Sequence, residues 1–451
     1  MHGLVVLLGL TVYAIASHTL RQRRNPSAAI AWVVSLILLP YVALPLYLAI
    51  GNRKVIGSRQ TRTSHHHRTN TKPGQLASAM GLPEIVSFKQ LAIHQDGGQA
   101  LNALRKMIEE ANHTIDLCSF LLGRDALGDE IVIQLMTRAR AGVRIRLLLD
   151  GIGFIIGRCP NLKRLSAAGV QVALFVSPLQ SPLRGRTNLR NHRKMVIVDG
   201  NWLWCGGRNL AAEYFEGTAT PLSRQHPWID LSFDLRGQLA QQALEQFEQD
   251  WTFATKGAVV KSRSVAGTRT TAICSHARLV PSGPDQLDDT IYTLLVSGCF
   301  TAQSRILLVT PYFVPDPTLL MALTLAARRG IKLDLLLPAR SNHRLADMAR
   351  HAALRELAAA GAHIWLSPTM LHAKAFLIDE DLAMVGSANL DERSLFLNYE
   401  LMVAFYDPMV VANFEHWIDG HKNRAACYRS AAPGIVRELA EGMVRWVAFQ
   451  L

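Results

Sequence analysis

One pattern of nine residues occurs twice in this chain, and its polar members have the same spacing in both copies. Residues 191–199 read NHRKMVIVD and residues 371–379 read LHAKAFLID. The corresponding histidines, His192 and His372, are 180 positions apart. Self-similarity at a fixed distance indicates two copies of one structural unit. The chain must therefore fold as two related domains rather than around one unrepeated core.

The segments before the two motifs repeat one order of helices and strands. Apolar residues at helical spacing alternate with short apolar runs, and a glycine ends a helix in each copy, at Gly142 and Gly330. The first copy predicts helix 101–111, strand 114–120, helix 129–141 and strand 143–150, and the second predicts strand 306–310, helix 319–329 and strand 331–338. This alternation predicts an α/β fold with two pseudo-symmetric domains, each a mixed sheet flanked by helices. Their expected bounds are 81–255 and 272–451, with a polar linker at 256–271.

Within each motif, the spacing decides which side chains can act together. Both motifs lie in apolar runs rich in β-branched residues, so both predict strands, on which side chains two positions apart share a face at about 7 Å. This spacing pairs two basic side chains in each copy, namely His192 with Lys194 and His372 with Lys374. The motif aspartates, Asp199 and Asp379, have the opposite parity, and Asp199 precedes a glycine, which is a hairpin-turn signal. We expect them to brace the turn.

These residue types suit phosphoryl transfer. The reaction needs a nucleophile, a proton donor for the leaving group, and cations around the non-bridging oxygens. Two histidines and two lysines supply this set, and a small-residue turn after each motif ends in an asparagine, Asn209 or Asn389, that can donate to a phosphate. The chemistry requires no metal and no cofactor. One histidine must be neutral to attack, and the other must be protonated to donate.

A carboxylate bonded to the far nitrogen of each imidazole would fix its tautomer and orientation. The candidates follow the asparagines: Asp230 in the first copy and Glu400 in the second, with Glu213 as a weaker alternative. One isolated motif of this kind arises by chance, and a lone histidine on a strand is more often a core residue than a catalyst. Two copies with the same trailing turn, at the same place in a repeated fold, favour a catalytic site.

Two apolar segments precede the repeats. Residues 3–20 carry no Lys, Arg, Asp or Glu, and after a short basic stretch residues 25–52 carry none either. A bilayer span needs about 20 apolar residues, so residues 1–52 predict a two-helix transmembrane anchor, with Pro40 and Pro45 kinking its second helix. A cleaved signal peptide is the alternative. It is disfavoured because no Lys or Arg precedes the first apolar run and a second apolar segment follows at once.

Basic residues indicate the orientation and the partners. Three arginines lie between the apolar segments and a larger basic cluster follows the second, so we expect the catalytic part to be cytosolic. The short loop between the apolar segments, with its three arginines, would then lie outside the cytosol, although the same rule keeps basic loops inside. A hairpin that enters and leaves the same leaflet would remove this conflict. The net charge of +13 favours an anionic partner, either nucleic acid or an acidic membrane. The apolar N-terminus favours the membrane.

Three groups of residues each allow two interpretations. They are the histidines His65, His66 and His67 in the polar linker 53–80, the arginines Arg184, Arg186, Arg190 and Arg193, and the tryptophans Trp202, Trp204 and Trp228. The histidines are metal ligands or, as we prefer, solvated linker. The arginines bind lipid head groups or form a solvated basic loop. The tryptophans lie at a membrane interface or, more often for such residues, in the core.

The duplicated motif with its trailing turn, GGRN at 206–209 and GSAN at 386–389, resembles the phospholipase D superfamily. Three segments more closely resemble bacterial cardiolipin synthases of the phospholipase D type: RNHRK at 190–194, TPYFVPD at 310–316 and GSANLDERSLFLNYE at 386–400. The N-terminal pair of apolar segments is similar as well, so the resemblance covers nearly the whole chain. The two copies differ in that Gly207 stands where the second has Ser387.

This resemblance implies two phospholipase D-like domains and a phosphatidyltransferase. One phosphatidylglycerol gives its phosphatidyl group to a histidine, glycerol leaves, and a second phosphatidylglycerol accepts the group to form cardiolipin. The implied site consists of His192, Lys194, Asp199, His372, Lys374 and Asp379, with Asn209 and Asn389 binding the phosphate. By analogy, His192 is the nucleophile and His372 the acid. The implied location is the bacterial inner (cytoplasmic) membrane, with a multi-pass anchor.

Other activities use the same motifs. Water, phosphatidylethanolamine or another alcohol as acceptor would make the protein a phospholipase D or a different phosphatidyltransferase, because pocket shape and water exclusion choose the acceptor. A nuclease or other phosphodiesterase would suit the basic charge. The apolar N-terminus and the segment 386–400 favour lipid, so we expect no nucleic-acid partner. A scaffold with a dead site has no support, since both motifs are intact, and protein partners leave no signal in the sequence.

Overall fold

The structure is a computed structural model of the chain. It describes residues 2–19, 26–51, 72–158, 162–176, 188–220, 223–255, 275–430, 432–434, 437–438, 441–442 and 444. The predicted linker 256–271 lies outside the described residues, as do the three linker histidines, Arg184 and Arg186.

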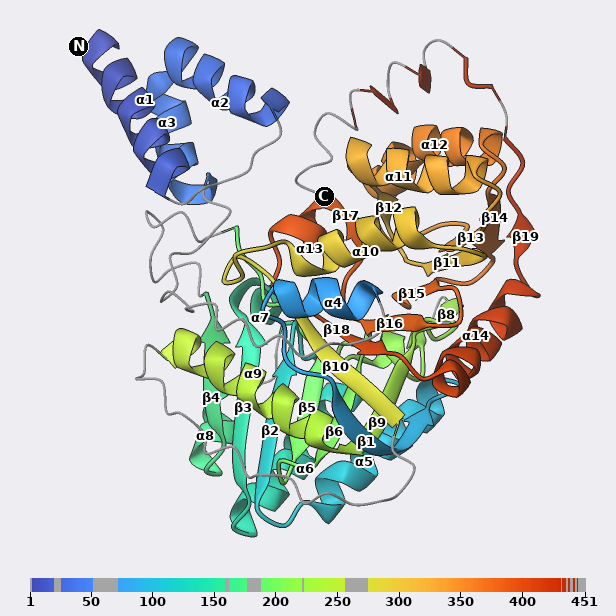
Figure 1. Ribbon diagram of the computed structural model, residues 1–451. Helices are drawn as coiled ribbons and strands as arrows, with labels where there is room; N and C mark the ends of the chain where they lie inside the picture. The colour runs from blue at the N-terminus through green and yellow to red at the C-terminus, as the bar shows by residue number, and fades with distance from the viewer. Residues whose placement is uncertain are drawn as a thin grey trace.

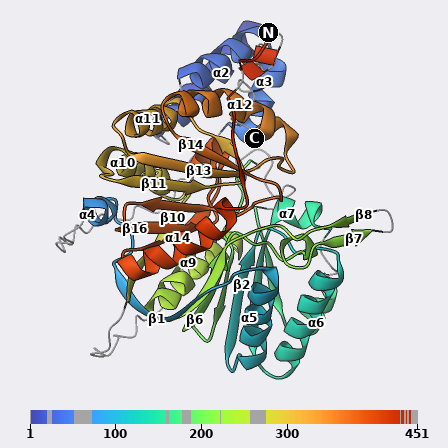
Figure 2. The ribbon, with the colours of Figure 1, turned by 90° about the vertical axis from the view of Figure 1, so that its right-hand side faces the viewer.

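One mixed sheet of 15 strands runs through both repeats (Figures 1 and 2). The first repeat contributes β1 (Val86–Ile93), β2 (Thr114–Ser119), β3 (Arg144–Asp150), β4 (Gln171–Phe175), β5 (Met195–Val198), β6 (Trp202–Gly206) and β9 (Ser232–Gly237). The second contributes β10 (Ser275–Ser282), β11 (Arg305–Val309), β13 (Lys332–Pro338), β14 (His363–Ser367), β15 (Ala375–Ile378), β16 (Leu382–Gly386), β18 (Glu400–Phe405) and β19 (Ala426–Cys427). Short separate ladders join β7 (Thr218–Thr220) to β8 (Ser223–Gln225), and β12 (Phe313–Val314) to β17 (Leu390–Asp391).

The strand order shows the duplication. From the antiparallel junction of β1 with β10, one half-sheet runs β1-β9-β6-β5-β2-β3-β4 and the other runs β10-β18-β16-β15-β11-β13-β14, ending in β19. In each half, three neighbouring strands are parallel and the rest are antiparallel. The predicted α/β fold with a mixed sheet in each repeat is confirmed. The continuous ladder that joins the two half-sheets was not predicted.

Helices cover the outer face of each half-sheet. The first repeat has α5 (Gly97–Glu110), α6 (Ala126–Arg140), α7 (Gly151–Ile156) and α8 (Leu162–Ala167), and the second has α10 (Thr290–Thr301), α11 (Pro317–Arg328), α12 (Arg344–Ala359) and α13 (Glu392–Phe396). Aspartates begin several of them: Asp96 accepts from the Gln99 amide and Asp125 from the Gly128 amide, both at 2.8 Å. Every helix and strand predicted ahead of the motifs is present, with ends displaced by up to four residues.

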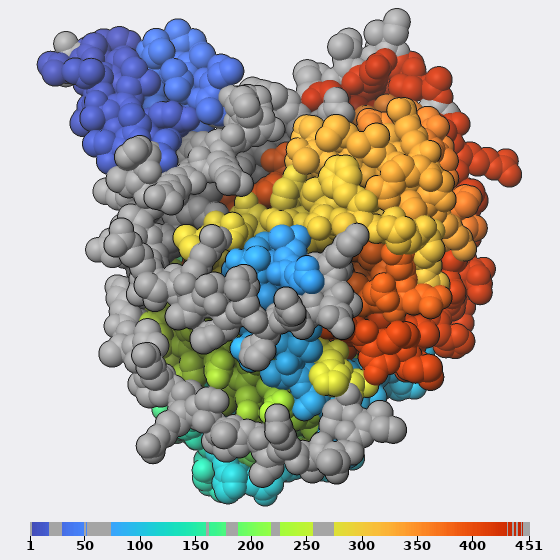
Figure 3. Space-filling model, in the orientation of Figure 1, coloured from blue at the N-terminus to red at the C-terminus, as the bar shows by residue number. Residues whose placement is uncertain are grey.

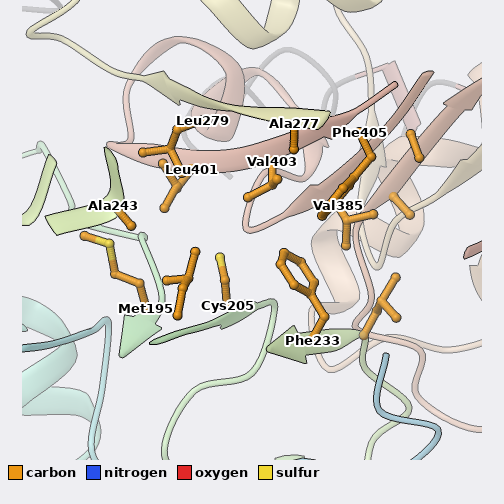
Figure 4. Packing of buried hydrophobic residues seen from close by; sticks show 14 of the residues in the cluster. Met195, Cys205, Phe233, Ala243, Ala277, Leu279, Val385, Leu401, Val403 and Phe405 are labelled. Carbon is orange, nitrogen blue, oxygen red and sulfur yellow. The ribbon is translucent and has the colours of Figure 1, made fainter. Parts of the chain in front are cut away.

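The two half-sheets enclose a central core between them. Figure 4 shows Met195, Cys205 and Phe233 of the first repeat opposite Leu401 and Phe405 of the second, all at most 1% exposed. Two long helices, α9 (Gln238–Thr255) and α14 (Pro408–Lys422), add apolar side chains to this core. Each large apolar side chain buried here contributes about 1.5–3 kcal/mol. The two repeats are therefore held together along their whole facing surface.

Residues 72–79, at the end of the predicted linker 53–80, form a helix, α4 (Lys72–Ala79). Ala77 is fully buried against the second repeat, where α4 packs on α10. Figure 3 shows this helix seated on the surface beside α10. The segment is polar in composition, so its short apolar face, which packs on the second repeat, was not predicted. Residues 53–71 of the linker lie outside the described residues.

The N-terminal segment forms three helices instead of the two that were predicted: α1 (His2–Thr19), α2 (Pro26–Leu38) and α3 (Pro40–Ile50). Pro40 stands at the first position of α3, where its missing N–H costs nothing, so the second apolar segment breaks here rather than kinking. Pro45 lies inside α3. Among the described residues, no helix combines the length and apolarity that a membrane crossing requires. The three helices pack against one another.

Candidate active site

The histidines and lysines of the motifs lie just before the strands on which they were predicted. β5 begins at Met195 and β15 at Ala375, one residue after the motif lysines. The preceding residues pair with the other repeat instead of with a neighbouring strand of their own. Isolated bridges join Asn191 to Tyr399 and Ile229 to Leu371.

Matching backbone hydrogen bonds accompany the two bridges. The amide of His192 donates to Tyr399 O at 2.9 Å, and the amide of His372 donates to Ile229 O at 2.6 Å. These two crossings bring each motif beside the carboxylate residue of the opposite repeat.

Each histidine is held by a carboxylate from the other repeat. His192 Nδ1 lies 3.0 Å from both carboxylate oxygens of Glu400, and His372 Nδ1 lies 2.7 Å from Asp230 Oδ2. Both carboxylates are fully buried. The sequence pointed to these two carboxylates, but it associated each with its own copy, whereas the structure exchanges them. Glu213, the weaker candidate, lies in the short helix η1 (Ala212–Tyr214).

The two carboxylates are supported differently. The hydroxyls of Ser387 and Ser394 and the amide of Asn398 donate to Glu400, with Ser394 Oγ at 2.6 Å and Asn398 Nδ2 at 3.2 Å. Asp230 Oδ1 accepts from the amide of Leu231 at 2.7 Å. The difference between Gly207 and Ser387 follows from this arrangement. A Cβ at position 207 would lie 2.3 Å from Asp230 Oδ1, so the shorter carboxylate lies against a glycine and the longer one against a serine.

Both motif lysines are buried beside the histidines. Lys194 Nζ donates to His192 O at 2.8 Å, and Lys374 Nζ lies 2.9 Å from His372 Nε2. Burial lowers the pKa of Lys194 to about 8 and that of Lys374 to about 7. A bound phosphate anion would stabilise both ammonium groups in their charged form.

The charges of the two repeats act on one another. Burial lowers the pKa of both histidines, and each is lowered further by both lysines. For the carboxylates, burial opposes ionisation, but the neighbouring cationic side chains prevail and lower the pKa of Glu400 and of Asp230, the latter to about 2. Ionised carboxylates only accept, so Nδ1 of each imidazole carries a proton, and Nε2 is the ring nitrogen that the carboxylate does not hold; in His372 it lies within reach of Lys374 Nζ.

The motif aspartates lie at the far ends of their strands. Asp199 accepts from the amides of residues 112, 113 and 114, the last two at 2.7 Å. Asp379 accepts in the same way from the amides of residues 303, 304 and 305. Asp199 has φ +51° and Gly200 has φ +64°, which is the conformation of a tight hairpin turn. Both aspartates thus tie the turn after the motif to the start of a neighbouring strand.

Aromatic rings surround the histidines. Phe120 makes an edge contact with the His192 ring at 5.5 Å, and Tyr214, Trp228 and Tyr312 lie 5.1, 5.5 and 6.5 Å from the His372 ring. Asn209 Nδ2 donates to the Tyr214 hydroxyl at 2.8 Å. Sequence patterns had not identified these rings as part of the site, since they come from four separate segments.

The two asparagines that were predicted to bind phosphate are buried. Asn209 is 2% exposed and Asn389 is 6% exposed. The side-chain Oδ1 atoms of both have no hydrogen-bond partner among the residues that the structure describes. These oxygens can accept from a donor group of a ligand, whereas a phosphate contact would require the Nδ2 groups, of which that of Asn209 donates to the Tyr214 hydroxyl.

Three residues that were considered for lipid contact prove to be internal. Arg193 is fully buried and forms an ion pair with Asp250, so it is not available to lipid head groups. Trp202 and Trp204 are at most 6% exposed and belong to the core of the first repeat, which confirms the core interpretation for these two. Within the described ranges, no three or more His, Cys, Asp and Glu side chains are grouped so that they could hold a metal ion.

Comparisons with known proteins agree with this geometry. A family model described as "Cardiolipin synthase, PLD-like domain" matches residues 104–251 and 300–422, and one described as "Phospholipase_D-nuclease N-terminal" matches residues 9–52. A curated relative, cardiolipin synthase A of Pseudomonas aeruginosa (strain LESB58), is 31% identical over 89% of this chain and 86% of its own. Cardiolipin synthase A of Pseudomonas syringae pv. syringae (strain B728a) is 30% identical over 94% of this chain and 91% of its own.

Among solved structures, phosphatidylserine synthase of Haemophilus influenzae Rd KW20 has the same fold. Its TM-score is 0.65 at 12% identity, and the match covers 84% of this chain and all of that one. The fold and the paired motifs define a phospholipase D-like enzyme. Within that class, the chain belongs to the cardiolipin synthase family, as its sequence features had predicted.

Proposed function

We propose that this protein is a cardiolipin synthase that moves a phosphatidyl group from one phosphatidylglycerol to another by way of a histidine. The observation that carries the proposal is the pair of imidazoles, each held at Nδ1 by a buried carboxylate and each with a lysine beside it. The names of the curated relatives, which align over most of both chains, support the choice of lipid.

In the first half-reaction, His192 Nε2 attacks phosphorus and a P–N bond forms. The P–O bond to the departing glycerol breaks, and His372 donates a proton to that oxygen. Lys194 and Lys374 stabilise the charge on the non-bridging oxygens, with Asn209 and Asn389 as further phosphate ligands. In the second half-reaction, a hydroxyl of the other phosphatidylglycerol attacks phosphorus, His372 takes up its proton, and the P–N bond breaks to release cardiolipin.

Substrate binding itself prepares the acid. Burial and two nearby ammonium groups lower the pKa of His372 in the empty site. A phosphodiester anion between the motifs offsets those positive charges and raises that pKa, because an opposite charge within about 4–6 Å favours the charged form. The proton donor is therefore generated where and when the lipid phosphate is bound.

We also propose that the N-terminal segment attaches the enzyme to the inner (cytoplasmic) membrane as a multi-pass anchor, with the catalytic part in the cytosol. The support is chemical: Leu4, Leu7, Leu8, Ile30, Leu38 and Val42 are each more than half exposed on α1 to α3. A large exposed apolar surface of this kind marks a membrane or protein contact. Deleting residues 1–52 should move the protein from the membrane fraction to the soluble fraction, and retention in the membrane fraction would refute the anchor.

The direct test is an assay in mixed micelles. The full-length enzyme is incubated with phosphatidylglycerol labelled in its acyl chains, in the presence of chelator, and lipid products and free glycerol are followed. Cardiolipin and glycerol should appear in equal amounts. His192→Ala and His372→Ala should be inactive, whereas His363→Ala, which removes a 57% exposed imidazole, should behave as wild type. Phosphatidic acid as the sole product would replace the acceptor by water, and turnover in the His192→Ala variant would refute the covalent route.

A further inference from the structure

Arg208 is a buried cation in the first repeat that has no counterpart in the second. It occupies the third position of the GGRN turn, where the second repeat has Ala388. Its side chain is 1% exposed. The guanidinium donates to three neutral oxygens: Tyr214 O at 3.0 Å, Asp230 O at 2.6 Å and Ser232 Oγ at 2.9 Å. It therefore grips the backbone of the residue whose carboxylate holds His372.

A second buried arginine has the same relation to the other carboxylate. Arg193 Nε donates to Glu400 O at 3.1 Å. The charge of Arg193 is neutralised, because its guanidinium pairs with Asp250 and lies 3.7 Å from Asp285. Among the residues that the structure describes, no ion pair joins Arg208 to a carboxylate. Both carboxylate residues are thus braced through their carbonyl oxygens, but only one of the two braces leaves a net positive charge.

The charges around the two histidines are consequently unequal. The charges nearest His192 are those of Glu400 and Lys194, and the charges nearest His372 are those of Asp230 and Lys374; each ring also interacts with the lysine of the other motif. The guanidinium of Arg208 is connected to His372 through Asp230, whose carbonyl oxygen it binds. Burial lowers the pKa of Arg208 to about 10, so it remains charged at neutral pH. Its charge is one of those that lower the pKa of Asp230.

Other titratable groups also face this side of the site. The groups around His372 are Lys374, Asp230, Lys194, Tyr214 and Tyr312, and those around Arg208 are Asp230, Asp96, Tyr214, the His94–Asp234 pair reached through Ser232, and His421 of α14. The second repeat supports Glu400 with the neutral donors Ser387, Ser394 and Asn398. In the second repeat, Arg393 also interacts with Glu400, but two further carboxylates, those of Asp391 and Asp150, act on it more strongly than Glu400 does.

We propose that Arg208 is a positioning residue that makes the two histidines unequal: its buried charge disfavours protonation of His372, and its bond to Asp230 O fixes the carboxylate that orients that ring. This inference rests on the proposed double-histidine mechanism. The charge of Arg208 adds to those of the lysines in keeping His372 neutral in the empty site. His372 therefore becomes the proton donor only when a lipid phosphate is bound beside it.

The test compares Arg208→Met with Arg208→Lys. Both replacements keep a long flexible stem, but only lysine keeps the charge. Removing the positive charge bound to Asp230 raises the pKa of the His372 imidazolium, because a like charge disfavours the protonated form. If the rate-limiting step requires protonated His372, the alkaline limb of the pH–rate profile of Arg208→Met moves to higher pH. If that step requires neutral His372, the acid limb moves to higher pH instead. Arg208→Lys should move neither limb.

The control is Arg278→Met, which removes another fully buried guanidinium, one that lies in β10 and contacts Ser78 and the Tyr406 ring. It should leave both limbs in place. A profile of Arg208→Met identical to wild type, or equal shifts in Arg208→Met and Arg208→Lys, would overturn the proposal. Titrating the ¹³Cε1 resonance of His372 in the same variants measures its pKa without turnover. An unchanged pKa there also overturns the proposal, while an enzyme that makes no cardiolipin refutes only the proposed function.

Discussion

The two halves of the catalytic site share one plan and differ in nearly every supporting residue. Both halves have a His–Lys pair ahead of a strand, a carboxylate from the opposite repeat, and an arginine on the carbonyl of that carboxylate residue. The first half uses glutamate with two serines and an asparagine around it. The second uses aspartate, a glycine, and a guanidinium that forms no ion pair with the residues the structure describes.

This difference separates what geometry requires from what chemistry requires. The exchange of carboxylates between repeats is symmetric, because matching bridges join the start of each motif to the residue before the opposite carboxylate, Asn191 to Tyr399 and Leu371 to Ile229. A transfer reaction needs a nucleophile and an acid, which are two protonation states of one residue type. Symmetric geometry cannot supply that distinction, so it must come from the unequal surroundings. Matching substitutions in the two halves of the site should therefore differ in their effects.

Removing either histidine should abolish turnover, but the two variants should fail at different steps. We expect a loss of about 10³-fold or more for each, because nucleophile and general acid each carry several orders of magnitude. With acyl-labelled phosphatidylglycerol and an acid quench, His372→Ala should still accumulate some labelled protein, since a nucleophile remains. His192→Ala should accumulate none. The reverse pattern would exchange the two roles and leave the site intact.

Neutralising the carboxylates should show the exchange between repeats. Glu400→Gln should impair the histidine of the first repeat and Asp230→Asn that of the second, each lowering kcat by about 10²–10⁴-fold, as loss of an orienting carboxylate does elsewhere. The carboxamide can place an N–H donor where a carboxylate oxygen accepted from imidazole Nδ1, and this disfavours the tautomer with its proton on Nδ1. In the labelled-protein assay, Asp230→Asn should resemble His372→Ala, and Glu400→Gln should resemble His192→Ala. If each carboxylate instead held the histidine of its own repeat, Asp230→Asn would resemble His192→Ala and Glu400→Gln would resemble His372→Ala.

Substituting the small residues beside the carboxylates should lower the free energy of unfolding more at Gly207 than at Ser387. Gly207→Ser places a Cβ 2.3 Å from Asp230 Oδ1 and forces that carboxylate away from His372. We expect a loss of about 1–3 kcal/mol in the free energy of unfolding, together with lower activity. Ser387→Gly removes one donor to Glu400, where Ser394 and Asn398 remain, and the acceptor of the Leu401 amide, but it introduces no clash and should cost about 1 kcal/mol. Urea unfolding of both variants measures the difference, and equal losses would contradict it.

The sequence was sufficient for the parts of the molecule whose signals are local. The helices that follow Asp96 and Asp125 were found because their apolar residues recur at helical spacing and a glycine, Gly142, follows the second; the two aspartate caps themselves were not predicted. The two carboxylates were found because each lies downstream of the asparagine of its own copy, Asp230 by 21 positions and Glu400 by 11. The His–Lys pairs were placed on strands that in fact begin at Met195 and Ala375, since the residues before them pair with the other repeat.

Non-local features left no sequence signal of their own. The carboxylate exchange depends on backbone bridges between residues such as Asn191 and Tyr399, which lie about 200 positions apart in the chain. Arg193 looked like an exposed member of a basic cluster, but Asp250 neutralises it in the interior. The break at Pro40 reflects a choice between kinking a helix and starting a new one, and the sequence is compatible with both.

The motif aspartates should give the smallest effect on catalysis, and the same effect in both repeats. Asp199 and Asp379 each accept from three consecutive backbone amides, so Asp199→Asn and Asp379→Asn should each lower stability by about 1–3 kcal/mol while activity per folded molecule changes little. Although burial opposes ionisation, the hydrogen bonds from these backbone amides lower the pKa of both carboxyl groups. The ionised form therefore stabilises the fold above the unfolded pKa, and that contribution is lost as pH falls through the lowered folded pKa. The gap in Tm between wild type and either variant should narrow as the buffer is made more acidic. A large loss of kcat at unchanged Tm would instead make the aspartates part of the chemistry.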